Sequence, residues 1–390
     1  VENDDEILIV AAARLQSTLG DADHKIIKTV KGRNLVGLRY QRLFDYLEVD
    51  GDICRVHTAD FVSTEDGTGI VHVAPAYGVD DLELGQRNNL PVVHGVGLDG
   101  YFKSEVTPVA GLFFKDADPV IIDLLEKQGL LFRQEKYLHN YPFGWRTGDP
   151  LIYYAKNAWY IRTTSVQERM VSLNQTINWV PHTIRDGRFG NWLEHNVDWA
   201  LSRERFWGTP LPIWICESTG KKEAVSSYDE LLSKDGLAGT EVWKAAKEAN
   251  PEMPEDLKVH KPYIDAVTYD SPFAPGSRMR RVPEVIDCWY DSGAMPFAQW
   301  GYPHRGRDEF AAQFPADFIS EALDQTRGWF YSLLAISTLV FSDEQQGEAG
   351  DAAHEYPHPF GNCVVLGLML GEDGTKMSKQ KRNYREPQEI

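Results

Sequence analysis

The sequence predicts a protein of the α/β class, and three observations support this prediction. First, residues 282–390 alternate strand-like apolar runs with a helical pattern, which is typical of a parallel sheet with crossover helices. Second, residues 1–140 combine short β-type runs with one amphipathic helical pattern. Third, 42% of the 390 residues are hydrophobic, so the chain can bury a sizeable core and should form two or three domains.

The first predicted domain, residues 1–140, is a compact α/β or β-barrel-like module. Its β-type runs and its amphipathic helix occupy residues 7–12, 53–58, 69–74 and, for the helix, 119–128. Short β-type runs mixed with one amphipathic helix suggest this kind of module.

Two further regions precede the parallel sheet. Residues 141–215 are aromatic-rich and are expected to lead back into the second α/β domain. Residues 216–281 are more polar, and the Pro- and Glu-containing run at 250–256 is typical of a small inserted subdomain.

The last region, residues 282–390, should form the parallel sheet. Apolar runs near Val285 and Phe318 predict strands, and Ser320 is a plausible N-cap for a long helix that begins at Glu321. Residues 362–370 read as a buried strand, and residues 371–374 (Gly-Glu-Asp-Gly) read as a tight turn.

Composition excludes several classes of protein. The longest apolar stretch, residues 331–341, is too short and too interrupted by Ser and Thr to span a bilayer, and the first five residues are not a signal peptide. We therefore expect a cytoplasmic location and no membrane partner.

The four cysteines are scattered without a CxxC pair, which argues against a disulfide framework and a cysteine-rich metal site. The net charge of −18 gives no support for a nucleic-acid partner.

Lys376 and Lys379 form the most informative motif, Lys-Met-Ser-Lys, directly after the predicted turn. Two ammonium groups at this spacing can converge on one polyphosphate and neutralise charge that builds up on its α-phosphate. Five of the ten residues from Lys376 to Arg385 are basic, so this segment is a candidate phosphate-binding site. The alternative is a solvated basic loop, because surface lysines are common.

A second group of polar residues follows the predicted strand near Phe318. On a helix, Glu321, Gln325 and Trp329 lie at i, i+4 and i+8, with Asp324 beside them, so they should share one face at the carboxyl end of a parallel strand. A carboxylate, an amide and an indole on one face suit a small aliphatic substrate next to a ribose. The alternative is that the acidic residues only stabilise the helix dipole.

These motifs resemble those of a known family. The lysine motif is similar to the KMSKS loop of class I aminoacyl-tRNA synthetases, and residues 324–329 (Asp-Gln-Thr-Arg-Gly-Trp) resemble the isoleucyl-tRNA synthetase family rather than the valine or leucine enzymes. The resemblance covers most of the chain from about residue 140 onward, through the segments 189–194, 198–210, 289–293 and 314–330. The Trp- and Arg-rich segment 198–208 has an alternative interpretation as a hydrophobic corner with salt-bridged arginines.

The resemblance implies a Rossmann-type catalytic half-domain and a role for each site residue. Asp324 would hold the adenosine ribose, Glu321 and Gln325 the adenylate and the amino acid, and Trp329 the isoleucine side chain. Gly367 would belong to the ATP-binding site. Lys376 and Lys379 would steady the transition state of adenylate formation.

The resemblance also implies an editing domain in residues 1–140. His72 lies in a β-type run, and Asp80 and Asp81 follow it. By family analogy, Asp81 grips the α-ammonium of a wrongly attached amino acid, and His72 helps to shape the pocket. The alternatives are a histidine that serves only structure and aspartates that cap a helix.

Some positions depart from the family pattern. The HIGH motif and the threonine-rich editing loop are missing from the sequence, so we expect this chain alone to be an excerpt that is inactive in activation. Where relatives often carry zinc-binding cysteines, this chain has Gly144 and Thr147, and only Cys216 survives of a second pair, so we predict no zinc. Ala322 replaces a Gly and Gln380 replaces the final Ser of the lysine motif, which puts catalytic efficiency in doubt.

The resemblance therefore predicts an enzyme that uses ATP with Mg, isoleucine and tRNA(Ile), and that acts as a monomer. It would form isoleucyl-adenylate, transfer isoleucine to tRNA(Ile) and hydrolyse valyl-tRNA(Ile), because one methylene changes binding by only about 1–3 kcal/mol. A valyl- or leucyl-tRNA synthetase is a rival within the enzyme class. A non-catalytic RNA- or nucleotide-binding fragment is the rival from another class.

Overall fold

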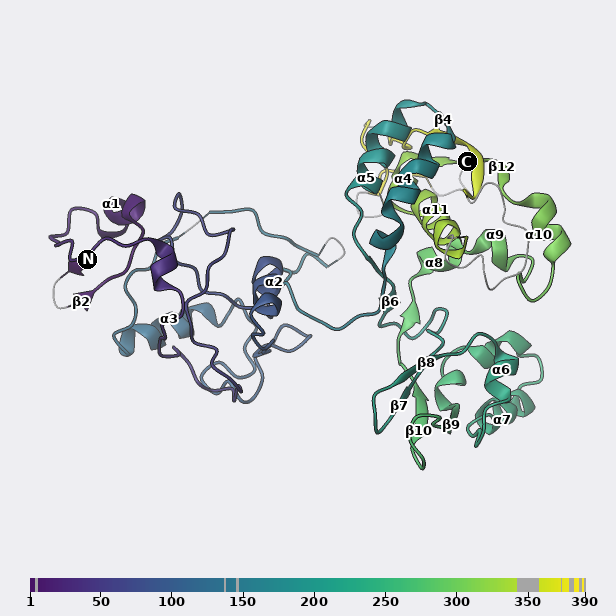
Figure 1. Ribbon diagram of the computed structural model, residues 1–390, viewed down its shortest axis with the longest axis horizontal. Coiled ribbons are helices and arrows are strands. Elements are labelled where there is room, and N and C mark those ends of the chain that lie inside the picture. The colour runs from purple at the N-terminus through teal and green to yellow at the C-terminus, as the bar shows by residue number, and fades with distance from the viewer. Residues whose placement is uncertain are drawn as a thin grey trace. The chain divides into compact units, whose positions relative to one another are not determined.

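The computed structural model describes residues 1–3, 6–136, 138–144, 147–341, 358–372, 374–378, 382–385 and 388. The chain divides into two compact units, Val1–Asn157 (unit 1) and Ala158–Ile390 (unit 2) (Figure 1). In the described part of the chain, no helix is both long and apolar enough to cross a lipid bilayer.

Unit 1 consists mainly of irregular segments that are joined by backbone hydrogen bonds. Its described helices and strands are β1 (Glu2–Asn3), β2 (Glu6–Ile7), η1 (Ala12–Arg14), α1 (Leu15–Leu19), η2 (Gly32–Leu35), α2 (Val79–Arg87) and α3 (Asp118–Lys127). Helix α3 confirms the helix predicted at 119–128. It begins with an acidic residue and a proline, Asp118 and Pro119, and both residue types are favoured in a first helical turn.

The predicted β-type runs of unit 1 do not become regular strands at residues 53–58 and 69–74. Around residue 55 the pairing is limited to one antiparallel bridge, Arg39 with Arg55. Ile70 and Val71 are about half exposed. A strand is stabilised mainly when its apolar side chains are buried against neighbours, and these two side chains gain little of that stabilisation. The β-barrel-like arrangement predicted for residues 1–140 is not confirmed.

Unit 2 contains the parallel sheet that the sequence predicts. Its strand order is β12 (Ala316–Ala322), β13 (Phe360–Leu366), β4 (Asn178–Val180), and both neighbouring pairs are parallel. Helix α11 (Trp329–Val340) lies between β12 and β13 in sequence, as expected for a crossover connection. Strand β13 ends four residues before the predicted end at 370, and Leu370 is 55% exposed.

The other described elements of unit 2 form the surroundings of this sheet and a separate antiparallel sheet. They are β3 (Tyr160–Ile161), η3 (Thr163–Val166), α4 (Gln167–Thr176), η4 (Arg185–Phe189), α5 (Gly190–Glu194), β5 (Trp199–Ala200), β6 (Ser202–Arg203), β7 (Ile213–Cys216), β8 (Lys222–Ala224), α6 (Tyr228–Leu232), α7 (Glu241–Ala249), η5 (Glu255–Val259), η6 (Ile264–Ala266), β9 (Thr268–Asp270), β10 (Arg278–Arg281), β11 (Val285–Ile286), α8 (Cys288–Gly293), α9 (Met295–Ala298), α10 (Arg307–Gln313) and η7 (Leu323–Arg327). The strand predicted near Val285 is β11, but it pairs antiparallel with β6 outside the parallel sheet.

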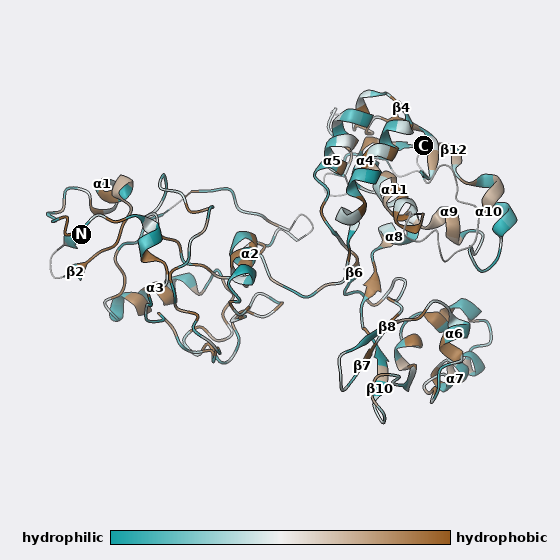
Figure 2. Cartoon of the chain, viewed as in Figure 1, coloured by the Kyte–Doolittle hydropathy of each residue, from teal (hydrophilic) through white to brown (hydrophobic). Residues whose placement is uncertain are grey.

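The main core of unit 2 lies between the parallel sheet and helices α4, α5 and α11. Helix α11 is buried along most of its length, and its colour in Figure 2 is mostly on the hydrophobic side. Its Phe330 packs edge to face on Trp179 of β4, with ring centroids 5.7 Å apart. Leu333 and Leu334 are almost completely buried, and each contributes about 1.5–3 kcal/mol through the hydrophobic effect.

The helix predicted to begin at Glu321 begins eight residues later, at Trp329. Strand β12 continues through Ala322 because its residues stay in register with β13, Glu321 beside Val365 and Ala322 beside Leu366. The hydrogen-bonded ladder therefore outweighs the local capping signal of Ser320. The expectation that Glu321, Gln325 and Trp329 share one helical face is wrong, because these residues lie on a strand, a 3₁₀ turn and a helix.

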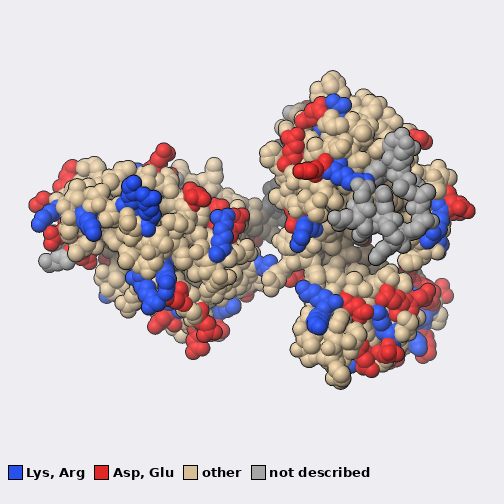
Figure 3. All heavy atoms as spheres, in the orientation of Figure 1, with Lys and Arg blue, Asp and Glu red and all other residues tan. Residues whose placement is uncertain are grey.

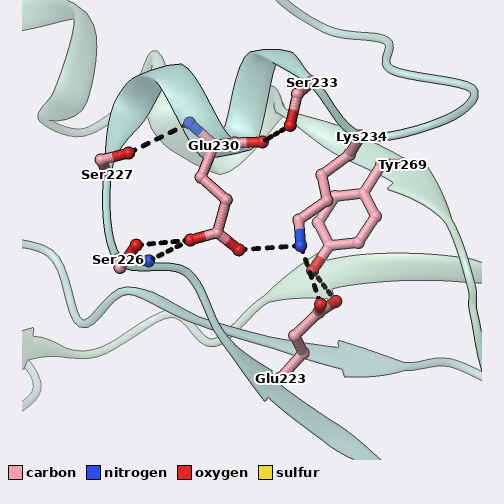
Figure 4. Close-up of polar contacts among 7 residues, drawn as sticks. All are labelled: Glu223, Ser226, Ser227, Glu230, Ser233, Lys234 and Tyr269. Atoms are coloured by element: carbon pink, nitrogen blue, oxygen red, sulfur yellow. Dashed lines mark hydrogen bonds and ion pairs between the residues drawn. The ribbon is translucent and has the colours of Figure 1, made fainter. Parts of the chain in front are cut away.

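A network of ionic hydrogen bonds ties the small antiparallel sheet to helix α6 (Figure 4). The ammonium of Lys234 lies 2.8 Å from Glu223 on β8 and 2.9 Å from Glu230 on α6. The hydroxyl of Tyr269 on β9 donates to Glu223 at 2.7 Å, and Ser226 donates to Glu230 through both its backbone N–H and its hydroxyl. The network joins helix α6 to β8 and β9, the two outer strands of a four-stranded sheet with the order β8, β7, β10, β9.

Acid is expected to weaken this network. Hydrogen bonds from Ser226, and then the ammonium of Lys234, lower the pKa of Glu230 from 4.5 to about 2. Because the folded-state pKa is the lower one, the stabilisation is complete above pH 4.5 and is lost as the pH falls toward 2. Thermal unfolding followed by circular dichroism should therefore show a steeper drop in melting temperature over this range for the wild type than for Glu230→Gln. Parallel profiles for the two proteins would contradict the assignment.

Candidate functional site

The turn η7 brings the predicted site residues of unit 2 to the carboxyl end of β12. Glu321 lies near the end of the strand, Asp324 and Gln325 lie on η7, and Trp329 is the first residue of α11. Glu321 and Asp324 are exposed, while Gln325 and Trp329 are half-buried. The carboxyl end of a parallel strand is where open α/β sheets bind ligands.

Gly367 lies at the same edge of the sheet. It directly follows β13, whose last residue, Leu366, pairs with Ala322 at the end of β12. Gly367 is exposed, and apart from its two chain neighbours no described residue has an atom within 4 Å of the position that a Cβ would take there. The ends of the two strands therefore place Gly367 near the start of η7.

The start of α11 is fixed by two hydrogen bonds to Trp329. Its backbone N–H donates to Oε1 of Gln325 at 3.1 Å, and its indole Nε1–H donates to the carbonyl of Ser292 at 3.0 Å. Gly328 is needed between them, because a Cβ there would lie 2.8 Å from Gln325 Oε1 and 2.9 Å from the indole of Trp289. The Gln325 amide thus supports the helix start, and the indole of Trp329 is held in one orientation.

Ser292 and Trp289 lie in segment 289–293, and nothing in that segment predicts their contacts with Trp329 and Gly328. Helix α8 positions both residues, and its start is capped by Asp287, which accepts the N–H of Trp289 at 3.2 Å. Asp287 also accepts from Arg203 at 2.6 Å and from the indole of Trp199 at 3.1 Å. The salt-bridged corner proposed as the alternative for segment 198–208 therefore fits Arg203. No local signal reveals the contact of Ser292 with a residue 37 positions away.

Lys376 lies on a hairpin that follows β13. Leu370 and Lys376 form an antiparallel bridge, and Gly374 turns the chain with a φ of 71°. The tight turn predicted at 371–374 is therefore confirmed for residues 371, 372 and 374, which the structure describes. The Lys376 side chain is exposed, and no described carboxylate lies within ion-pair distance of it. Lys379 and Gln380 lie outside the described residues.

The side chain of Asn383 holds the lysine hairpin together. Its carbonyl oxygen accepts the N–H of Ser378 at 2.9 Å, and its amide donates to the Thr375 hydroxyl at 3.1 Å and to the Lys376 carbonyl at 3.3 Å. The backbone of Lys376 is therefore fixed, whereas its ammonium group is available for an anion.

Two arginines lie close together, Arg327 at the end of η7 and Arg188 on η4. The guanidinium of Arg327 stands 4.3 Å from the ring centre of Trp192 and donates to the carbonyl of Arg188 at 2.9 Å. Its partial burial, and then the nearby positive charge of Arg188, lower the pKa of Arg327. Among the described residues, neither arginine has a carboxylate partner.

The second candidate site lies in unit 1, at the start of α2. Asp81 is half-buried, and its Oδ2 accepts the backbone N–H of Ala74 at 3.0 Å. This carboxylate does not cap its own helix, so the capping alternative is wrong for Asp81. The contact instead joins Asp81 to the segment 72–75, on which His72 is exposed.

The segment 72–75 also lines a cavity of about 590 Å³. Its lining includes His72 and Ala74 together with Tyr40, Cys54 and Tyr77, and most of the lining is apolar. An apolar cavity with a few polar groups is the usual form of a small-molecule site. His72 therefore lines a cavity, and Asp81 supports one of its walls through Ala74.

The residues near Cys216 do not fit a zinc site. Structural zinc is held by four thiolate or imidazole ligands, whereas Cys216 is fully buried with hydroxyl neighbours, Ser218 at 3.5 Å and Ser277 at 3.3 Å. Among the described residues, no group of three or more His, Cys, Asp and Glu is arranged to hold a metal ion.

Comparisons with known proteins place these features in a family. The family model of class I tRNA synthetases (I, L, M and V) matches residues 8–390. The chain is 44% identical to isoleucine–tRNA ligase of Clostridium novyi (strain NT) over 390 residues, which is 100% of this chain and 34% of the relative. It is 45% identical to isoleucine–tRNA ligase of Streptomyces avermitilis over 386 residues, or 99% of this chain and 34% of the relative.

Among solved structures, the chain is similar to the LeuRS in the ternary complex of Agrobacterium radiobacter K84 agnB2 LeuRS, tRNA and LeuAMS. The TM-score is 0.33 and the identity 16%, over 84% of this chain and 30% of that chain. This chain spans about a third of the length of the curated relatives. Because the family model matches nearly the whole sequence, the chain belongs to the class I tRNA synthetases of the isoleucine, leucine, methionine and valine group.

Proposed function

We propose that the complete protein is an isoleucine–tRNA ligase. It activates isoleucine with ATP and Mg to isoleucyl-adenylate, transfers isoleucine to tRNA(Ile) and hydrolyses misacylated valyl-tRNA(Ile). The observation that carries this proposal is the 44% identity, along the whole chain, with relatives described as isoleucine–tRNA ligases. The chain alone, about a third of such a relative, is proposed to be inactive in activation.

In the activation step, the isoleucine carboxylate attacks the α-phosphate of ATP, a new P–O bond forms and pyrophosphate leaves. We assign Asp324 to the ribose, Glu321 and Gln325 to the adenylate and the amino acid, and Trp329 to the isoleucine side chain. The common edge at the ends of β12 and β13 supports this assignment, since both strands are parallel and end together.

Three further residues complete the proposed activation site. Gly367 lets the nucleotide approach the backbone, because it carries no side chain and has open space around it. Lys376 and Lys379 neutralise the charge that develops on the phosphates. The exposed ammonium of Lys376 on a fixed backbone supports its part of this role.

Unit 1 is proposed to belong to the editing module, in which Asp81 binds the α-ammonium of a misplaced valine and His72 shapes the pocket. The cavity that His72 lines supports the part proposed for His72. A second hydrolytic site is needed because one methylene supplies only about 1–3 kcal/mol of discrimination.

The division of the chain is also proposed from the family resemblance. Residues 1–140 would be the later part of a barrel-like editing domain, 141–215 the return connection, 216–281 an inserted subdomain and 282–390 the second half of a Rossmann-type domain. We propose a monomeric cytoplasmic enzyme. Acidic and basic side chains are interspersed on the face seen in Figure 3, and the net charge is −18. The proposal that tRNA is a partner is therefore based on the family and not on the charge.

Pyrophosphate exchange on the complete protein tests the proposed function. We expect exchange to depend on isoleucine far more than on valine or leucine at equal concentration. Faster exchange with valine or leucine would favour a different synthetase of the group. Absence of exchange with all three amino acids would favour a non-catalytic nucleotide- or RNA-binding protein.

We also expect no stoichiometric zinc in the complete protein, either at Gly144 and Thr147 or at Cys216. A thiol surrounded by hydroxyls lacks the ligands that a structural zinc requires. Elemental analysis of the purified protein, with and without a chelator, measures this directly. A stoichiometric metal that Cys216→Ser removes would overturn the prediction.

A further inference from the structure

The hydroxyl of Thr326 closes the turn that carries two of the proposed site residues. Thr326 is completely buried, and its Oγ1 donates to the carbonyl of Leu323 at 2.8 Å. The same oxygen accepts the Nε–H of Arg188 at 3.0 Å. Asp324 and Gln325 are the two residues inside the ring that the bond to Leu323 closes. One hydroxyl that both donates and accepts therefore joins this 3₁₀ turn to Arg188.

A second contact joins the same two segments in the opposite direction. Arg188 lies on η4, and its carbonyl accepts from the guanidinium of Arg327 at 2.9 Å. The Arg327 guanidinium is also placed over the ring of Trp192. Two hydrogen bonds thus link η4 and η7: the Arg188 side chain donates to Thr326, and the Arg327 side chain donates to the Arg188 carbonyl. Of these two side chains of η7, that of Thr326 also bonds within the turn, to Leu323.

The direction of the Asp324 carboxylate depends on the backbone of this turn. In the described part of the chain, Asp324 is exposed and no hydrogen bond or ion pair is formed by its side chain. Gln325 does have a partner, because its Oε1 accepts the N–H of Trp329. A site residue without its own side-chain support relies on the rigidity of the element that carries it.

We infer that Thr326 is a positioning residue for amino-acid activation, because its hydroxyl, held by Arg188, orients the turn that presents Asp324 and Gln325. This inference rests on the proposed function. Thr326 itself is buried beneath the turn and is not expected to touch a substrate. Its effect should therefore pass through the orientation of the two neighbouring residues.

The test uses the complete protein with Thr326→Val, which keeps the shape of the side chain and removes the hydroxyl. We expect kcat/KM for ATP in isoleucine-dependent pyrophosphate exchange to fall about tenfold, with a raised KM for ATP. Thr326→Ser keeps the hydroxyl and should restore most of the loss. A misplaced turn weakens contacts with the nucleotide even when the fold survives.

Thr338 provides a matched control on α11. It is also completely buried, and its Oγ1 donates to the carbonyl of Leu334 at 2.7 Å, but it lies outside the turn. Thr338→Val should lower thermal stability to a similar extent and leave KM for ATP unchanged. Equal changes in KM for the two valine variants would mean that general destabilisation explains the effect, and would refute the inference.

Arg188→Met tests the other half of the contact. If Arg188 acts through the Thr326 hydroxyl, the double variant should be little worse than Thr326→Val alone. Two results would refute this inference while leaving the proposed function intact. One is a loss in the double variant that equals the product of the two single losses. The other is an active wild type together with normal kinetics of Thr326→Val. A wild type that shows no isoleucine-dependent exchange would instead refute the proposed function, and this inference with it.

Discussion

Replacement of Lys376 by alanine in the complete protein is expected to slow isoleucyl-adenylate formation by about 10²-fold or more, with little change in isoleucine affinity. The ammonium neutralises charge that is largest in the transition state, so its loss should affect the rate more than ground-state binding. Single-turnover measurement of adenylate formation, together with equilibrium binding of isoleucine, separates these two quantities.

The structure indicates that this variant should fold. The Lys376 side chain is exposed, and its backbone is held by the amide of Asn383 and by the bridge to Leu370, which alanine retains. Lys244→Ala on helix α7 is a suitable control, because Lys244 is also an exposed lysine of unit 2. A rate loss below threefold for Lys376→Ala, or an equal loss for Lys244→Ala, would contradict the assignment.

The elements that the sequence predicts well are those whose signals are local. Helix α3 has an acidic residue and a proline at its start, and the turn before Lys376 has its two glycines, so a few neighbouring residues decide the structure. The parallel sheet is also predicted, because its apolar strands alternate with the apolar helix α11.

The sequence misplaces the elements that depend on distant partners. Ser320 carries a helix-capping signal, yet the pairing of β12 with β13 keeps the chain extended through Ala322. The contact between Thr326 and Arg188 spans 138 positions, and neither residue belongs to a local motif that predicts it. Residue type and family resemblance therefore indicate the site residues, whereas only the fold shows which residues orient them.

Asp81 is expected to have an equally specific effect on the second proposed activity. In the complete protein, Asp81→Ala should leave isoleucine-dependent pyrophosphate exchange intact and let valine-charged tRNA accumulate. The loss of one charge-assisted hydrogen bond costs about 1.5–3 kcal/mol, so deacylation of valyl-tRNA(Ile) should slow about ten- to a hundredfold. Deacylation of the preformed ester, followed over time, measures this rate.

Asp81→Ala alone does not separate two roles of the carboxylate, because Oδ2 of Asp81 also accepts the backbone N–H of Ala74 in the wall of the cavity. Asp81→Asn keeps an oxygen acceptor for that N–H and removes the negative charge. If the charge binds the α-ammonium of the substrate, the asparagine variant should deacylate as slowly as the alanine variant. The exposed neighbour Asp80 supplies the matched control, and Asp80→Ala should deacylate normally. Normal deacylation by Asp81→Asn would show that the side chain only supports the segment 72–75, and would reject Asp81 as the group that recognises the ammonium.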